Sequence, residues 1–110
     1  ELHVVSDQIG SPTYAKDLAE MVLKIIDSKN NQYGLYHYSN QGALSWFEFA
    51  NAIFKLKNIQ IKVNPIPTSS YPTLARRPKY SVLSLTKTTS KNSLTNKLVL
   101  SSLKNCLQNI

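Results

Sequence analysis

The chain has 110 residues, 42% of them hydrophobic, which suits one small globular domain and excludes wholesale disorder. Its single cysteine, Cys106, excludes a disulfide within the chain and a zinc site built from cysteines. The net charge is +7, and residues 49–110 contain ten Lys and Arg residues but no carboxylate. This half of the chain could bind an anionic ligand or partner, or its lysines could simply be scattered over solvated faces.

No run of 18 apolar residues occurs, so we expect no membrane span. The chain begins at Glu1 without an initiator methionine or a signal-like apolar stretch, so we expect a piece of a longer protein. The single cysteine fits a reducing, cytoplasmic location. Cys106 is expected to be a buried small hydrophobic residue of the last helix rather than a reactive thiol.

The first third of the chain predicts a strand and a helix. Leu2–Val5 is a short apolar run typical of a strand. Ser11 is the expected N-cap of a helix, with Pro12 at the first helical position, where a missing N–H costs nothing. Apolar residues then recur at three- and four-residue spacing, and the polar segment 30–32 is expected to end the helix.

The middle of the chain predicts two more strands around a second helix. The aromatic-rich, alternating segment Tyr33–Ser39 is typical of a strand. Ser45 and Glu48 have the spacing of a capping box and predict the start of a helix that continues to about Leu56. Residues 60–65 predict a third short strand.

Four prolines within residues 65–78 predict an irregular segment, which we call the proline-rich arm. A brief strand at 81–83, a short helix near 86–92 and a terminal helix over 98–110 are expected to follow it. The whole chain, 1–110, is therefore predicted to be one small α/β lobe, α+β-like, with three short strands, about four helices and the arm. Three short strands make a poor independent sheet.

Self-contained catalysis is not expected, because several catalytic patterns are missing. The three glycines form neither a dinucleotide-binding GxGxxG loop nor a P-loop, and no tyrosine has a lysine four positions later. No Gly-x-Ser-x-Gly elbow occurs. His3 and His37 are both expected to be ordinary strand residues rather than catalytic bases.

A first candidate binding cluster is the polar loop 7–13, which the pattern places at a helix N-terminus. Backbone N–H groups there favour an anion, and side chains of the loop could hydrogen-bond a sugar or a base. The alternative is simple helix initiation, with Asp7 satisfying loop amides. The candidate residues of this loop are Asp7, Gln8, Gly10, Pro12 and Thr13.

Two further candidates are Arg77 and Trp46. Arg77 lies in the arm, where prolines would pre-position a guanidinium for bidentate contact with phosphate oxygens; a salt bridge to another part of the protein is the alternative. Trp46 is the second residue of the predicted capping box, so its indole could stack on a base. Core packing is the favoured interpretation of Trp46.

The clusters, in their order and spacing, resemble the C-terminal part of the dTDP-4-dehydrorhamnose reductases, a family of extended short-chain dehydrogenases/reductases. The resemblance covers most of the chain and rests on three segments: VVSDQIGSPTYAKDLA (4–19), GLYHYSNQGALSWFEFANAIF (34–54) and PIPTSSYPTLARRPKYSVLSLTK (65–87). The family's Pro-x-Trp before the last helix is replaced by Asn96-Lys97-Leu98-Val99, and Arg76 adds a basic residue beside Arg77.

The resemblance implies that the full-length enzyme would reduce the 4-keto group of a dTDP-sugar with NADPH to give dTDP-L-rhamnose. Its NADPH-binding Rossmann domain, with a Tyr/Lys catalytic pair, would precede Glu1. The present lobe would bind the nucleotide-sugar, so the 110 residues alone are expected to be inactive. Family members can use Mg²⁺ at a dimer contact formed by carboxylates, but the absence of acids after Glu48 argues against that site here.

The expected partners are therefore a dTDP-sugar and the chain's own N-terminal Rossmann domain, and the resemblance leaves a homodimer open. The alternative function is a non-catalytic regulatory or interaction module of the same fold. A basic nucleic-acid binder is a third interpretation, which predicts steep salt dependence. Since the sequence has no recognised nucleic-acid-binding motif, we do not expect nucleic acid as a partner. The lack of a long apolar run likewise argues against a membrane.

Overall fold

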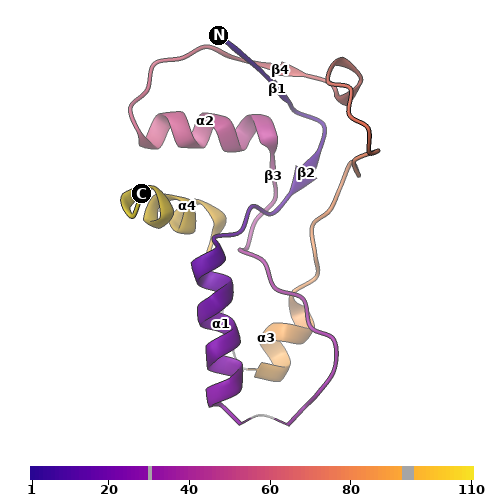
Figure 1. Cartoon of the computed structure of the whole chain (residues 1–110), viewed down its shortest axis with the longest axis vertical. Coiled ribbons are helices and arrows are strands. Elements are labelled where there is room, and N and C mark those ends of the chain that lie inside the picture. The colour runs from indigo at the N-terminus through magenta and orange to yellow at the C-terminus, as the bar shows by residue number, and fades with distance from the viewer. Residues whose placement is uncertain (30, 93–95) are drawn as a thin grey trace. The chain divides into compact units, whose positions relative to one another are not determined.

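A computed structural model of the chain describes residues 1–29, 31–92 and 96–110 (Figure 1). The chain divides into two compact units, each made of two segments. The first unit comprises Glu1–Ser11 and Ala43–Val82, and the second comprises Pro12–Gly42 and Leu83–Ile110. The predicted single lobe is thus a mixed α/β chain with few strands, but its packing is organised around two centres.

The first unit is built on a pair of parallel strands. β1 (Leu2–Val5), predicted from the apolar run, pairs with β4 (Val63–Ile66), which begins three residues later than the predicted third strand. The helix α2 (Trp46–Leu56) packs against both strands, and Val5 is buried. A second, two-residue pairing joins β2 (Ile9–Gly10) to β3 (Leu44–Ser45) in antiparallel fashion.

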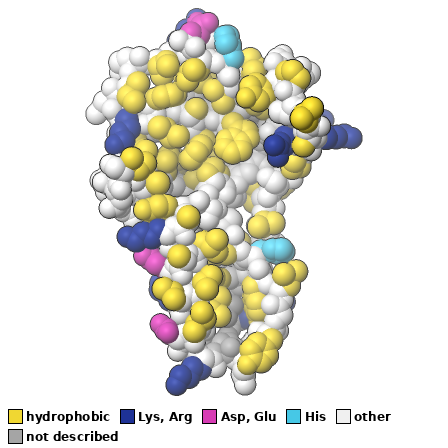
Figure 2. Space-filling model, in the orientation of Figure 1, with side chains coloured by type: hydrophobic (Ala, Val, Ile, Leu, Met, Phe, Trp, Pro, Cys, Tyr) yellow, Lys and Arg dark blue, Asp and Glu magenta, His cyan; other side chains and the backbone are white. Residues whose placement is uncertain are grey.

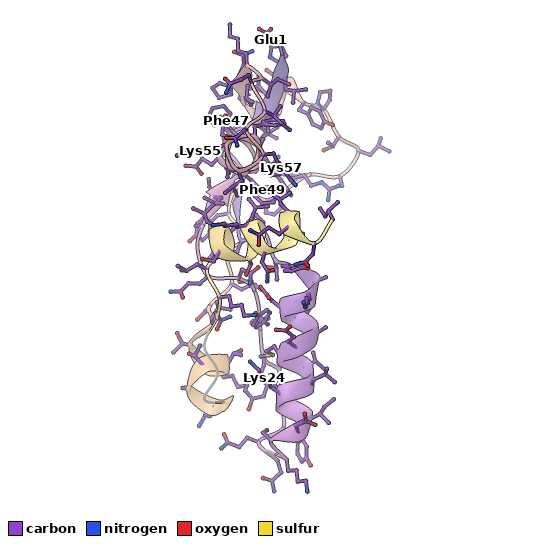
Figure 3. All side chains as sticks on the ribbon, turned by 90° about the vertical axis from the view of Figure 1, so that its left-hand side faces the viewer. Glu1, Lys24, Phe47, Phe49, Lys55 and Lys57 are labelled. Atoms are coloured by element: carbon purple, nitrogen blue, oxygen red, sulfur yellow. The ribbon has the colours of Figure 1, made fainter. Side chains whose placement is uncertain are left out.

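The start of α2 follows the predicted capping box. The Ser45 hydroxyl accepts the Glu48 N–H at 3.1 Å, and the Glu48 carboxylate accepts the Ser45 N–H at 2.7 Å. Two N–H groups without a partner in the helix are satisfied by this exchange. In the view along α2 in Figure 3, Phe47 and Phe49 lie on different sides of the helix.

The proline-rich arm is irregular, as its spacing of prolines predicts. After β4 it forms one short 3-10 turn, η1 (Thr68–Ser70), and then continues without helix or strand until Tyr80. Tyr80 makes a single bridge to Ile9, and Ser81–Leu83 does not form the predicted strand. The prediction of a strand was wrong because only Tyr80, just before this segment, pairs with a neighbour, and that neighbour, β2, is itself only two residues long.

The second unit is mainly helical. It contains α1 (Ala15–Asp27), α3 (Thr86–Asn92) and α4 (Val99–Gln108), all three of which were predicted (Figure 1). Met21, Val99 and Leu103 form its buried apolar centre. Cys106 on α4 is only partly buried, less than was predicted for a buried small hydrophobic residue.

A buried carboxylate joins three segments of the second unit. Asp17 on α1, only 3% exposed, accepts hydrogen bonds from Asn40 Nδ2 at 2.9 Å and from the Ser102 hydroxyl of α4. Lys97 Nζ lies 3.3 Å from Asp17 and 3.2 Å from Glu20. Since a buried charge is costly unless it is paired and hydrogen-bonded, these partners are what allow the carboxylate to sit inside.

The predicted strand Tyr33–Ser39 does not form. Its carbonyl groups are instead bonded by side chains: Lys87 donates to Leu35 at 2.8 Å, Thr88 donates to His37, and Asn96 donates to Ser39 at 2.7 Å. The alternating pattern is therefore present without a neighbouring strand to pair with, and His37 is not a strand residue.

The predicted boundaries of the first helix were also wrong. α1 begins at Ala15 with Tyr14, not Ser11, in the N-cap position, so Pro12 lies before the helix. Asn40 Oδ1 accepts the Tyr14 N–H at 2.8 Å, a tertiary contact that local capping rules do not anticipate. The helix ends at Asp27, before the predicted segment 30–32, of which residue 30 lies outside the described residues.

Asp17 predicts an acid dependence of stability. Burial raises its pKa, but hydrogen bonds from Ser102, Asn40 and Lys97 outweigh burial and hold the pKa below the ordinary 3.8. Because the unfolded chain takes up the proton at a higher pH, the stabilisation is fully present above pH 3.8 and is lost as the pH falls through the lowered pKa. Asp17→Asn should remove this dependence and cost about 1–3 kcal/mol at neutral pH.

Urea unfolding at neutral pH and below pH 3.8 measures both effects. Glu20→Gln is the matched control, because Glu20 also pairs with Lys97 but is exposed to solvent, with 41% of its side chain accessible. An unchanged acid dependence in Asp17→Asn would contradict the assignment.

Candidate functional site

Asp7 is engaged by a residue 61 positions away. Its carboxylate accepts the Thr68 N–H at 2.9 and 3.1 Å and the Thr68 hydroxyl at 2.6 Å. The side-chain hydrogen bond from Thr68, followed by its backbone N–H, lowers the pKa of Asp7, so the group stays ionised at neutral pH. Asp7 therefore does satisfy an amide, as the alternative interpretation predicted, but an amide of the arm rather than of its own loop.

Gln8 and Gly10 contact the same stretch of chain. Gln8 Nε2 donates to the Thr68 hydroxyl at 3.2 Å. A Cβ added to Gly10 would lie 3.0 Å from the Ser81 hydroxyl oxygen, so the glycine permits a close approach of two segments. Asp7 and Gln8 are thus brought together on Thr68, whereas Gly10 lies against Ser81.

Pro12 and Thr13 belong to the second unit. Thr13 Oγ1 accepts the Asn40 N–H at 3.1 Å, while Asn40 Oδ1 takes the Tyr14 N–H at the start of α1. α1 begins two residues after Thr13, so the loop 7–13 ends before the helix N-terminus, and anion binding there stays a prediction. Asn40 has no local signal in the sequence that would have revealed this role.

Trp46 is 54% exposed, so the favoured interpretation of core packing was wrong. It contacts Phe49 edge to face, with ring centroids 6.4 Å apart and planes at 67°. This contact leaves more than half of the residue's surface open to solvent. Stacking on a base stays a prediction.

Arg77 lies on the exposed part of the arm. Residues 69–80 are all exposed, and Figure 2 shows basic side chains at the outer edge of this region. Among the described residues, neither Arg77 nor its neighbour Arg76 forms an ion pair. A guanidinium held on a proline-flanked segment suits an anionic ligand.

Sequence reasoning missed Thr68 and Ser81. Both lie in segments that the sequence describes only as irregular or weakly extended, and their partners are about 60 to 70 residues away. No spacing rule connects hydroxyl residues over that distance, so only the folded chain could identify them.

Within the described ranges, no group of three His, Cys, Asp or Glu side chains is arranged to hold a metal ion. No described helix is both long enough and apolar enough to cross a membrane.

Comparison with known proteins identifies the family. The model of the RmlD substrate binding domain matches residues 1–110, and the chain belongs to this family. Spore coat polysaccharide biosynthesis protein SpsK of Bacillus subtilis is 50% identical over 84 residues, covering 76% of this chain and 29% of that protein. The dTDP-4-dehydrorhamnose reductase of Aggregatibacter actinomycetemcomitans is 45% identical over 97 residues, covering 78% of this chain and 33% of its own length.

A solved structure agrees with these relatives. The dTDP-4-dehydrorhamnose reductase of Bacillus anthracis, in complex with NADP, matches with a TM-score of 0.90 and 38% identity, covering all of this chain and 39% of that one. The chain therefore spans about a third of the length of the curated relatives it matches.

The close approach at Gly10 predicts a coupled effect of two substitutions. Gly10→Ala should displace the Ser81 hydroxyl from its 3.3 Å contact with the Ile9 carbonyl and cost about 1 kcal/mol of stability. In a Ser81→Ala background the same change should cost little, because the crowded atom is gone. Urea unfolding of the four proteins of this cycle measures the coupling, and additive costs would refute the contact.

Proposed function

We propose that this chain is the substrate-binding part of an NADPH-dependent dTDP-4-dehydrorhamnose reductase of the short-chain dehydrogenase/reductase type. The observation that carries the proposal is the match to the RmlD substrate binding domain over all 110 residues. The exposed guanidinium of Arg77 and the half-exposed Trp46 support it, since a nucleotide-sugar carries both a diphosphate and a base.

In this proposal, the chain binds and orients the dTDP-sugar. Arg77 contacts the diphosphate, and Trp46 offers an indole face to the base. Bound NADPH supplies the hydride for reduction of the 4-keto group. The proton donor and the cofactor site belong to a Rossmann domain outside these residues, so the 110 residues alone are expected not to oxidise NADPH. The product, dTDP-L-rhamnose, is a precursor for cell-surface polysaccharide, and a cytoplasmic location fits the nucleotide-sugar and NADPH.

The Rossmann domain is also the proposed partner of the second unit. One face of α1 exposes large apolar side chains: Leu18 by 43%, Val22 by 46% and Ile26 by 65%. They recur every four residues and so form one stripe. Figure 2 shows hydrophobic side chains gathered over this helix. Because the matched relatives are about three times as long as the chain, we commit to the rest of the same polypeptide as the occupant of this face.

Cysteine accessibility tests this docking in the full-length protein. In a Cys106→Ala background, a thiol at Val22→Cys should react with a thiol reagent roughly tenfold or more slowly than one at Lys24→Cys, because burial requires local opening before reaction. Lys24, which is labelled in Figure 3, comes two residues after Val22, and this helical spacing places it on the opposite side of α1. Equal rates at the two positions would show that the apolar face is open.

Binding of dTDP to the full-length protein tests the proposed function. Arg77→Ala should weaken the affinity by roughly 10- to 100-fold, the loss expected for hydrogen bonds to a charged group. Arg76→Ala is the matched control and should change the affinity by less than about threefold, as for an exposed charge without a fixed partner. Isothermal titration calorimetry measures both.

Two outcomes would contradict the proposal. Unchanged affinity in Arg77→Ala would remove Arg77 from the binding site. A full-length protein that binds dTDP but does not oxidise NADPH with a dTDP-4-keto sugar would instead indicate a non-catalytic module of the same fold, and its sequence before Glu1 should then lack the Tyr-x-x-x-Lys pair.

A further inference from the structure

We propose that Ser6–Gly10, which we call the clasp, is a positioning device that fastens both ends of the arm and so places Arg77. The proposal rests on the proposed function and extends it: Asp7 and Gln8 act on the ligand through the arm instead of touching it. Every contact that carries this inference lies within the first unit.

The clasp holds the N-terminal end of the arm by backbone and side-chain bonds. The Ser6 N–H donates to the Ile66 carbonyl at 3.0 Å, and the Ser6 hydroxyl points to the same oxygen at 3.4 Å. Asp7 then accepts both the N–H and the hydroxyl of Thr68, and Gln8 donates to that hydroxyl. Thr68 therefore has two polar groups bound by two consecutive clasp residues.

The C-terminal end of the arm is held by the next clasp residue. The Ile9 N–H donates to the Lys79 carbonyl at 2.8 Å, and the Ile9 carbonyl accepts the Ser81 N–H at 2.9 Å. Gly10 allows the Ser81 side chain to approach closely. Ile9 thereby closes the arm at a point two residues after Arg77.

Between these two anchors, residues 69–78 have few bonds of their own. Tyr71 N–H donates to the Thr68 carbonyl at 3.0 Å, and the Thr73 hydroxyl donates to the Ala75 carbonyl at 2.6 Å. The whole stretch is exposed. A surface loop whose two ends are close together keeps its shape through its anchors and its stiff residues, here the prolines. The position of Arg77 therefore depends on both anchors.

The charge of Asp7 favours positioning over direct binding. Its two oxygens are already engaged by Thr68, and the Thr68 hydroxyl bond keeps its pKa low. An ionised carboxylate repels the diphosphate of a nucleotide-sugar, so it is a poor direct ligand for it. As an acceptor for Thr68, the same carboxylate forms strong charge-assisted hydrogen bonds.

A double-mutant cycle in the full-length protein tests this role. Asp7→Asn should weaken dTDP binding roughly tenfold in the wild-type background, because it weakens charge-assisted bonds at the first anchor. In an Arg77→Ala background, Asp7→Asn should have almost no further effect, since the arm no longer carries the group that it positions. Additive losses would show that Asp7 contacts the ligand directly and would overturn the proposal.

A conservative pair at Thr68 separates the hydroxyl bond from general stability. Thr68→Val should weaken dTDP binding, whereas Thr68→Ser, which keeps the hydroxyl, should restore it. Thr88→Val is the matched control: it removes the same hydroxyl from a bond to His37 in the second unit and should leave dTDP affinity unchanged. Equal affinities in Thr68→Val and wild type would overturn the proposal.

Amide hydrogen exchange decides the proposal independently of any ligand. Asp7→Asn should speed exchange roughly tenfold at the hydrogen-bonded amides of Thr68, Ser70 and Tyr71, with no change in peptides from α1. Unchanged exchange in the arm would refute the clasp. If wild-type protein does not bind dTDP, the proposed function fails, and hydrogen exchange alone then confirms or refutes the clasp.

Discussion

The first unit depends on the hydrogen bonds of five consecutive residues, Ser6–Gly10. Directly after β1, this segment bonds to the end of β4, to Thr68, to β3 and to both Lys79 and Ser81. Each contact joins residues that are far apart in the chain, and closing such long loops costs conformational entropy. Several hydrogen bonds made at one place offset this cost. The far end of the arm is anchored through this segment by the hydrogen bonds of Ile9 with Lys79 and Ser81.

The second unit depends on a different constraint, the buried carboxylate of Asp17. Asn40 from one segment and Lys97 and Ser102 from around the start of α4 meet at its two oxygens, so that α1 and two other segments are joined. Removing one partner leaves a charge or a polar group buried without compensation, which costs more than the bond itself contributes. The network thus requires the three segments to pack in one arrangement. The few buried apolar residues of the centre contribute the apolar surface that is removed from water.

Local patterns predicted local structure well. The capping box at Ser45 and Glu48, the helical periodicity of α1 and α4, and the irregular arm are all present, because each depends on residues within one or two turns. The strand predicted at Tyr33–Ser39 is absent, because a strand needs a neighbour that the described chain does not provide. The exposure of Trp46 was missed for a related reason, since burial is set by what packs against a helix face.

From the amino-acid order alone one can identify an Arg on a proline-stiffened arm and a polar loop before a helix, and one can see that no Tyr-x-x-x-Lys pair is present. The contacts that these residues make are set by the folded chain. Asp7 and Gln8 meet Thr68 about 60 residues later, and α1 begins at Ala15 because Asn40 accepts the Tyr14 N–H. Propensity and spacing report the energetics of neighbours in sequence, whereas hydrogen-bond partners across 60 residues are chosen by the packing of the whole unit.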